Sequence, residues 1–383
     1  MTVKVTKPAV NVREELADLR KPTGLAGEAM LRAETPQEQF NLIGAGRRNL
    51  IINGAMQVSQ RGTGAVTSGT AYPVDRFLLT NGTAGAFSIQ YSTTSPSNFG
   101  QSIALTITGT DTSPDATDFS SIRYKVEHND MRHLYWGYST ASTVTLSFYV
   151  RSSVTGTHGG AIRNDSVNKA YPFSYTIDNA DTWERKTITI PGETTGSWGS
   201  GVNTGLEINW CIGAGSSRLG AAGAWNNNNN VGATGQVNLY ATNSSTFYLT
   251  GVQLELGKVA TPFEHRSYGE ELALCQRYYY RIQGDNAPLG NGFCLSSTSG
   301  RFTVNFPTPM RTKPTSLDTT GTASNYRILH TTATTCSAVP SVNQASTYAF
   351  RGDFYAASGL TAGNGAIIDM TGSSSFLAWD VEL

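Results

Sequence analysis

The sequence predicts an all-β protein built from antiparallel β-sandwich modules. Three observations indicate this class: many short segments in which hydrophobic and polar residues alternate, abundant turn residues, and no long helical segment between them. Polarity is carried mainly by Ser, Thr, Asn and 40 glycines, because only 15% of the 383 residues are charged. An average soluble domain has roughly 25% charged residues. This composition is typical of β domains whose loops are rich in turn residues.

Charge and hydropathy exclude two classes of protein. Lys plus Arg and Asp plus Glu both number 28, so the formal net charge is zero, which argues against a nucleic-acid-binding protein. No apolar run approaches the roughly 20 residues of a membrane-spanning helix. The first residues also lack the apolar core of a signal peptide. We therefore expect no nucleic-acid partner, no membrane insertion, and synthesis in a cytoplasm.

Residues 1–48 differ from the rest of the chain in their dense charge and small apolar content. Two short helices are predicted there, one over 12–19 and one that begins at the capping signal of Thr35 and Pro36. Both are shorter than the roughly 12–15 residues that an isolated helix needs in water. We expect an arm that becomes ordered against a partner, with a flexible tail as the alternative. The apolar residues expected to contact that partner are Val12, Leu16, Leu19, Leu31, Phe40 and Leu42.

From residue 49 the pattern is that of β-strands. Hydrophobic residues at every second position predict strands with one buried and one exposed face. At Gly251 the hydrophobic positions change phase, which indicates a β-bulge. Many such strands without a long intervening helix predict an antiparallel sandwich of the jelly-roll type over 49–266. The clearest alternating segments are 103–107, 143–150 and 206–212.

A helix is predicted at 269–277, inside a connecting segment 267–280. It has Glu270 and Glu271 in its first turn and Arg277 in its last, which suits the helix dipole. The pattern after it predicts a second, smaller β-sandwich domain over 281–383. We find no internal repeat at a fixed period, which disfavours a right-handed β-helix.

Cysteines, histidines and carboxylates show no spacing typical of a chemical site. The four cysteines and five histidines do not have metal-ligand spacing, and the cysteines are expected to be free. Asp75, Glu207 and Glu255 lie near predicted strands, where surface or turn functions explain them better than the paired carboxylates of a glycosidase. We therefore expect no catalytic residues, no metal ion and no cofactor.

Aromatic residues in Gly-rich and Asn-rich loops are the candidate binding residues. Trp198 lies in Gly-Ser-Trp-Gly-Ser-Gly, and Trp225 precedes five asparagines that begin with Asn226 and Asn227. Neither tryptophan has strand alternation around it, so both are expected to be exposed. Indole rings beside amides suit ligands that are rich in hydroxyl groups, such as glycans. The alternative is that the rings pack against their own loops or a neighbouring subunit.

Other aromatic residues are placed by the strand pattern. Trp183 and Trp210 lie in alternating segments and are expected in the core. Trp136 and Tyr138 follow a charged stretch, and the pattern leaves both positions open. The run Tyr278-Tyr279-Tyr280 gives more aromatic surface than one short strand would bury, which favours an oligomer.

Three stretches resemble virion proteins of tailed bacteriophages. Residues 28–42 resemble the N-terminal attachment region of fibre-like proteins in phages of aquatic bacteria. Residues 48–62, followed by 74–77, are similar to the opening of jelly-roll modules in phage tail fibres, which themselves resemble carbohydrate-binding modules. Residues 249–266 and 275–279 are similar to the closing strand and exit helix of the same module.

The resemblance implies a trimeric or otherwise oligomeric virion fibre with a surface-binding function. On this interpretation, residues 1–48 attach to tail, baseplate or other virion proteins, and a homotrimer assembled in the host cytoplasm binds host surface polysaccharide from the virion. Two alternatives stay open: a capsid-bound or baseplate-bound fibre with a structural function alone, and the less favoured glycan depolymerase. Fold-level analogy by itself does not establish function.

Overall fold

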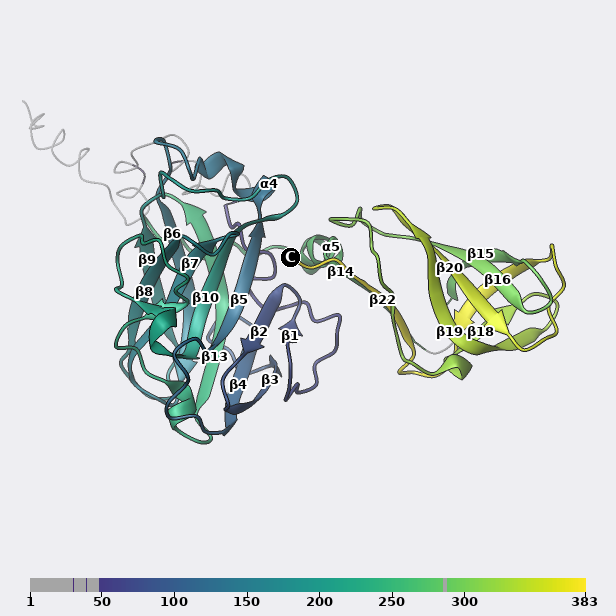
Figure 1. Ribbon diagram of the computed structural model, residues 1–383, viewed down its shortest axis with the longest axis horizontal. Coiled ribbons are helices and arrows are strands. Elements are labelled where there is room, and N and C mark those ends of the chain that lie inside the picture. The colour runs from purple at the N-terminus through teal and green to yellow at the C-terminus, as the bar shows by residue number, and fades with distance from the viewer. Residues whose placement is uncertain (1–29, 31–38, 40–47, 285–287) are drawn as a thin grey trace, which may run out of the picture.

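The computed structural model describes residues 30, 39, 48–284 and 288–383, and these consist almost entirely of β-strands. Figure 1 shows a large β-sandwich and a smaller barrel, with the strands β14 (Tyr279–Gln283) and β22 (Phe376–Asp380) running between them. The predicted all-β class is confirmed.

In the described part of the chain, the sandwich consists of a six-stranded and a five-stranded antiparallel sheet. The six-stranded sheet has the order β1 (Ala71–Val74), β2 (Phe77–Asn81), β5 (Phe119–Glu127), β10 (Thr204–Ala214), β7 (Gly156–Asn164) and β8 (Ala170–Ile177). The five-stranded sheet has the order β3 (Ala86–Ser92), β4 (Ser102–Gly109), β13 (Thr246–Leu256), β6 (Val144–Ser152) and β9 (Glu184–Ile190). The chain crosses between the sheets several times, as expected for a jelly-roll sandwich.

The main core lies between these two sheets and uses the predicted inward positions. Leu105, Phe148, Trp210 and Leu249 are completely buried in it. Burial of each such side chain contributes about 1.5–3 kcal/mol. The expectation of one exposed face per strand was wrong for β10, which is buried on both sides because residues 215–240 cover part of its outer face.

Short elements complete the sandwich at its ends and edges. Two of them, β11 and β12, form a small parallel pair in the 215–240 segment. The bounds are α4 (His128–Met131), η1 (Arg132–Leu134), η2 (Ser216–Arg218), β11 (Leu219–Gly220), β12 (Gly232–Ala233) and η3 (Leu239–Ala241). The segment that contains α4 and η1 lies at one end of the sandwich (Figure 1).

The chain leaves the sandwich through helix α5 (Tyr268–Gln276). The helix begins at Ser267, whose side chain accepts a hydrogen bond from the backbone N–H of Glu270. It ends at Gln276, so it is shorter than the predicted connecting segment 267–280. Tyr280 already belongs to β14, where it pairs with Trp379 of β22, in keeping with the preference of aromatic residues for strands.

The C-terminal region is a closed six-stranded barrel, and the predicted second β-sandwich was wrong. Alternation identifies the buried side of each strand, but closure depends on pairing between the end strands, here β15 with both β16 and β21. The order is β15 (Pro288–Cys294), β16 (Ser299–Asn305), β20 (Ala349–Ala356), β19 (Ala333–Ala345), β18 (Tyr326–Leu329) and β21 (Gly365–Met370). The remaining elements of this region are β17 (Asp318–Thr319), which pairs with β22, and η4 (Ala323–Asn325).

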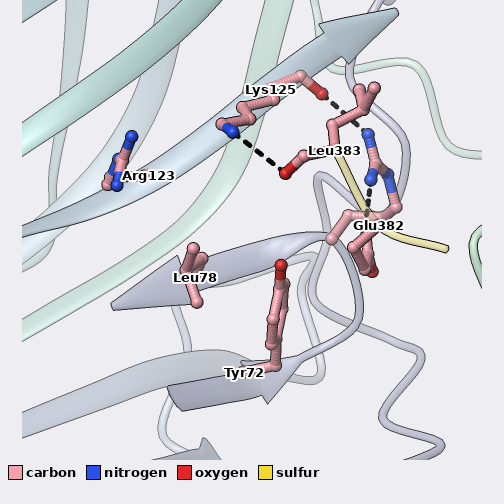
Figure 2. A pocket seen from close by; sticks show the side chains of 7 residues that line it. Tyr72, Leu78, Arg123, Lys125, Glu382 and Leu383 are labelled. Atoms are coloured by element: carbon pink, nitrogen blue, oxygen red, sulfur yellow. Dashed lines mark hydrogen bonds and ion pairs between the residues drawn. The ribbon is translucent and has the colours of Figure 1, made fainter. Parts of the chain in front are cut away.

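Residues after β22 return to the sandwich and dock on its six-stranded sheet. Arg76 forms an ion pair with Glu382, and Lys125 Nζ donates to the backbone oxygen of Leu383 at 3.0 Å (Figure 2). Arg61 pairs with Asp380 at 2.8 Å. The space left between these groups is only about 10 Å³, so the joint is closely packed. The barrel is therefore attached to the sandwich through both the outgoing and the returning strand.

Candidate functional site

The tryptophans expected to be exposed are packed against one another. Trp198 is only 3% exposed, and its indole N–H donates to the backbone oxygen of Thr195 at 3.1 Å. Its ring centroid lies 4.7 Å from that of Trp136 and 5.5 Å from that of Trp225, both in edge-to-face geometry. The expectation of an exposed Trp198 was wrong, because three loops distant in sequence meet at this end of the sandwich and bury its ring.

The neighbouring residues of the Asn-rich loop also have structural contacts. The half-buried Trp225 donates its indole N–H to the backbone oxygen of Pro191 at 2.7 Å. Asn226 forms a backbone bridge with Ala170, which ties the loop to β8. Of the four expected glycan-binding residues, Asn227 alone is exposed. We therefore do not place the binding site here.

The residues expected to attach the arm lie outside the described residues. The prediction for them stays a prediction. They are Val12, Leu16, Leu19, Leu31, Phe40 and Leu42.

Aromatic side chains gather instead on the outer face of the five-stranded sheet. Each is partly exposed, and each contacts another ring of the group. We call this group the outer aromatic strip. Its members are Phe99, Tyr149, Trp183, Tyr248, Phe263 and His265.

One end of the outer aromatic strip is a four-ring cluster around Phe99. The Phe99 ring lies 5.2 Å from Tyr149, 5.0 Å from Phe263 and 5.3 Å from His265, measured between centroids. Tyr149 comes from β6, while Phe263 and His265 come from the segment that crosses the sheet after β13. Tilted and edge-on contacts of this kind hold rings in fixed orientations, and each is worth about 0.5–1.5 kcal/mol beyond its buried area.

The predicted β-bulge lies directly beneath this cluster. The register between β13 and β6 shifts between Thr250 and Gln253, so the bulge at Gly251 is confirmed. Gly251 has a φ of 60°, and a Cβ there would lie 2.7 Å from the Phe99 ring and 2.8 Å from the Tyr149 ring. Only glycine combines this left-handed conformation with such close ring contact. The bulge therefore shapes the surface on which the rings lie.

The other end of the strip is formed by Trp183 and Tyr248. Their ring centroids are 6.1 Å apart, and the Arg151 guanidinium lies 4.9 Å from the Tyr248 centroid. The expectation that Trp183 belongs to the core was wrong, because it precedes β9 and lies against the outer side of the sheet. Arg151 and Tyr149 are two residues apart on β6 and therefore point to the same face. They connect the two ends of the strip.

One signal in the sequence could have identified part of this strip. Tyr149 and Tyr248 occupy the outward positions of alternating strands, where small polar residues are usual. Large aromatic residues at such positions indicate a surface that is used for contact. Phe99, Phe263 and His265 lie in loops, and no local pattern could have placed them beside these strands.

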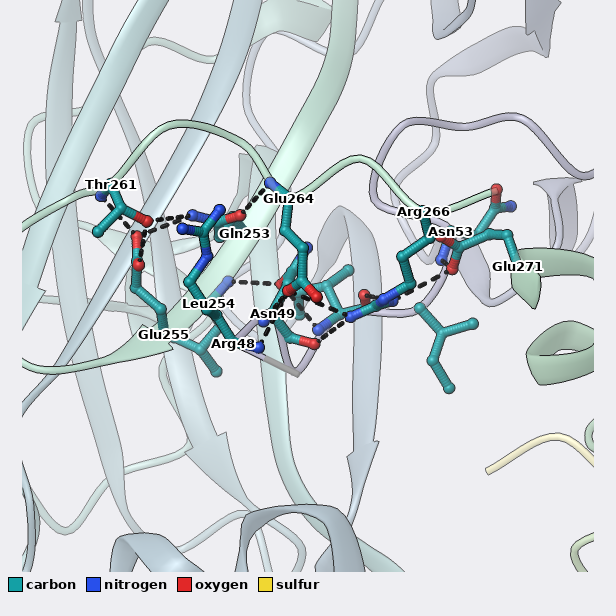
Figure 3. Close-up of polar contacts among 12 residues, drawn as sticks. Arg48, Asn49, Asn53, Gln253, Leu254, Glu255, Thr261, Glu264, Arg266 and Glu271 are labelled. Atoms are coloured by element: carbon teal, nitrogen blue, oxygen red, sulfur yellow. Dashed lines mark hydrogen bonds and ion pairs between the residues drawn. The ribbon is translucent and has the colours of Figure 1, made fainter. Parts of the chain in front are cut away.

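The two sequence blocks that resemble the ends of a jelly-roll module meet in a buried polar network (Figure 3). The Asn49 side chain accepts hydrogen bonds from the backbone N–H groups of Ile51 and Leu254 and donates to the backbone oxygen of Val252 at 3.1 Å. Arg266 donates to the backbone oxygen of Asn49 at 2.5 Å. These residues close the sandwich, so their function is structural.

Three carboxylates near strands are fully engaged inside the protein. Burial alone would raise the pKa of Glu207, but the guanidiniums of Arg163 and Arg123 lower it to about 2. Asp75 is buried, which raises its pKa to about 6, and it accepts a hydrogen bond from the backbone of Gln60. Glu255 accepts hydrogen bonds from Thr261. None of them faces the outer aromatic strip as a free acid or base.

Metal sites and membrane spans were sought in the same described residues. No group of three or more His, Cys, Asp or Glu side chains is close enough there to hold a metal ion. Within 48–284 and 288–383, no helix has the length and apolar character needed to cross a membrane. All four cysteines are buried and free, as predicted.

Comparison with known proteins finds similar folds among solved structures but no family. No family model and no curated protein matches the chain. The enzymatically active domain of bacteriophage CBA120 tailspike protein 4 is 12% identical, with a TM-score of 0.29, over 55% of this chain and 21% of that chain. The match thus spans about a fifth of the tailspike chain.

Two of the similar structures are carbohydrate-binding modules. The family 11 module from Clostridium thermocellum, solved with a β-1,3-1,4-mixed-linked tetrasaccharide, is 14% identical over 52% of this chain and 99% of that chain (TM-score 0.26). The CBM22-1 xylan-binding domain of Xyn10C from Paenibacillus barcinonensis is 12% identical over 56% and 100%, respectively (TM-score 0.25). Similarities this low leave the function to be inferred from the site itself.

Proposed function

We propose that this protein is a tail-fibre or receptor-binding subunit of a tailed bacteriophage that binds host surface glycans through the outer aromatic strip. The observation that carries the proposal is the strip itself: six partly exposed aromatic side chains on one sheet face. Sugar rings have apolar faces that stack on aromatic rings, and their hydroxyl groups need polar partners. Arg151, beside Tyr248, supplies such a partner.

Binding without catalysis fits the chemistry of the site. Hydrolysis of a glycan needs two carboxyl groups across the scissile bond. Glu207 and Glu255, the strand carboxylates of the sandwich, are held by internal hydrogen bonds, Glu207 with two arginines and Glu255 with Thr261. We therefore propose a non-enzymatic protein that acts through non-covalent contacts.

The remaining parts of the proposal concern assembly. Residues 1–48 attach the protein to the tail, baseplate or another part of the virion, and the chain forms a homotrimer. Exposed apolar side chains of the barrel support self-association: Phe293 is 47% and Ile367 is 50% exposed, on the adjacent strands β15 and β21. Native mass spectrometry of the full chain tests this part, and a monomer at all concentrations would contradict it.

Adsorption of the labelled full-length protein to susceptible host cells tests the proposal. We expect saturable binding that competes with phage adsorption and that falls at least tenfold in Tyr248→Ala. Tyr138→Ala is the matched control, since Tyr138 is 68% exposed but lies away from the strip, and it should bind like the wild type. Equal binding by both variants would refute the strip as the site.

Two other outcomes would point to the alternatives. Absence of any binding by a folded, correctly assembled protein would favour a structural fibre without a host contact. Release of new reducing ends from host polysaccharide would favour the depolymerase.

A further inference from the structure

A second candidate binding surface lies on the barrel, apart from the outer aromatic strip. Two adjoining cavities of about 440 Å³ and 290 Å³ open on the outer side of β16 and share Thr303. The first extends from β16 to Tyr280 of β14, and the second extends to Ser346 beside β19. Together they form one groove, which we call the barrel groove.

Polar side chains cross the barrel groove in a single row. The pairing register places Asn291 opposite Thr303, Thr303 opposite Arg351, and Arg351 opposite Gln344, on four neighbouring strands. All four are exposed, and the alternate positions on these strands, such as Phe302 and Phe350, are buried in the barrel. Neighbouring strands are about 4.8 Å apart, so the row is about 14 Å long. This length and this set of amide and hydroxyl groups suit an oligosaccharide rather than a single sugar.

One wall of the barrel groove is a fixed aromatic ring. Tyr280 stacks on Trp379, with centroids 5.6 Å apart and an angle of 14° between the rings, and it meets Phe306 edge-on at 6.0 Å. Trp379 is completely buried and also packs against Phe350. Because one face of Tyr280 is held by these contacts, a ligand meets a ring that needs little further ordering.

The charge of the groove selects the class of ligand. Its lining contains Arg351 and neither aspartate nor glutamate. The nearest carboxylate along β20, that of Asp353, is paired with Arg301 at 2.7 Å, which largely offsets its charge. An arginine binds carboxylates through two parallel hydrogen bonds. No carboxyl pair that could cleave a glycosidic bond lies in the lining.

We propose that the barrel groove is a second, independent glycan site that binds acidic oligosaccharides, with Arg351 on the carboxylate and Tyr280, Asn291 and Gln344 on the sugar rings and hydroxyl groups. The protein would then hold one polysaccharide at two places, or two different glycans at once. Two linked sites raise the overall affinity well above that of either alone.

The test uses the full-length protein carrying Tyr248→Ala, so that the outer aromatic strip no longer contributes. Its binding is measured on an array of matched carboxylated and neutral bacterial oligosaccharides. We expect retention of carboxylated members, weaker at higher salt because exposed charges are screened. In the same background, Arg351→Gln should lower the affinity for the best-retained member at least tenfold.

Arg132→Gln is the matched control, because it removes the same charge from an exposed position on the sandwich and should change the affinity less than twofold. Retention of neutral glycans alone, no retention at all, or equal losses in the two arginine variants would overturn the proposal. The outcome is separate from that of the outer aromatic strip, which is tested by comparing Tyr248→Ala with the wild type.

Discussion

Arg76 and Glu382 form a buried ion pair between residues 306 positions apart, which fastens the returning end of the barrel to the sandwich. Their side chains are only 2% and 6% exposed. The Arg76 guanidinium also lies 3.5 Å from the centroid of the Tyr278 ring. Burial would lower the pKa of Arg76, but the Glu382 carboxylate raises it above its usual value, so both groups are charged in the folded protein.

Removal of one partner of this pair should loosen the barrel. In Glu382→Gln the arginine keeps its charge in a buried site, which costs about 3–5 kcal/mol. We expect a single calorimetric transition in the wild type, and an early separate transition of one body in the variant. Asp178→Asn, which breaks the exposed Lys186–Asp178 pair, is the control and should change stability by less than about 1 kcal/mol. Identical calorimetric traces for both variants would show that the joint does not depend on this pair.

Gly251→Ala should damage both the fold and the binding surface. The left-handed conformation costs a non-glycine residue about 1–2 kcal/mol. Displacement of the Phe99 and Tyr149 rings by the new methyl group adds about 1–3 kcal/mol. Urea unfolding and glycan binding are the two measurements, and we expect both to weaken.

Gly201→Ala is the matched control for that experiment. Gly201 has nearly the same φ, 58°, but a Cβ there would meet no atom within 4 Å. It should show the conformational cost alone and leave binding unchanged. Should the two alanine variants prove equally stable, the close packing of Phe99 over the bulge would be disproved.

Glu207 should make the protein sensitive to acid. Its folded pKa of about 2 lies below the usual 4.5, so its contribution is complete above pH 4.5 and is lost as the pH falls toward 2. From pH 5 to pH 3, the wild type should lose about 2 kcal/mol more stability than Glu207→Gln, because each pKa unit corresponds to about 1.4 kcal/mol. At pH 7 the variant should be the less stable, since Arg123 and Arg163 lose their partner. Parallel stability–pH curves for the two proteins would contradict this assignment.

Asn49→Ala should weaken closure of the sandwich. The substitution removes three hydrogen bonds and leaves the N–H groups of Ile51 and Leu254 and the oxygen of Val252 buried. An unsatisfied buried polar group costs about 1–3 kcal/mol. We expect a loss of several kcal/mol in chemical unfolding, whereas Asn227→Ala, at an exposed position, should stay within about 0.5 kcal/mol of the wild type. A loss of less than 1 kcal/mol in Asn49→Ala would mean that water replaces the side chain.

The local sequence pattern was sufficient to predict the strands and the sandwich. Alternation placed Leu105, Phe148 and Trp210 on inward faces, where the structure has them. A phase change alone predicted the bulge at Gly251. These features depend on the two-residue period of a strand, which each segment carries by itself.

Tertiary structure alone decided which aromatic rings meet solvent and how the second body closes. Trp198, in a loop of glycines and serines, is buried because Trp136 and Trp225 come from distant segments to cover it. The outer aromatic strip joins Phe99 and Tyr149, and the barrel joins β15 and β21, in the same way. Exposure and strand closure are properties of contacts between segments far apart in the chain, and the period of a single segment does not contain them.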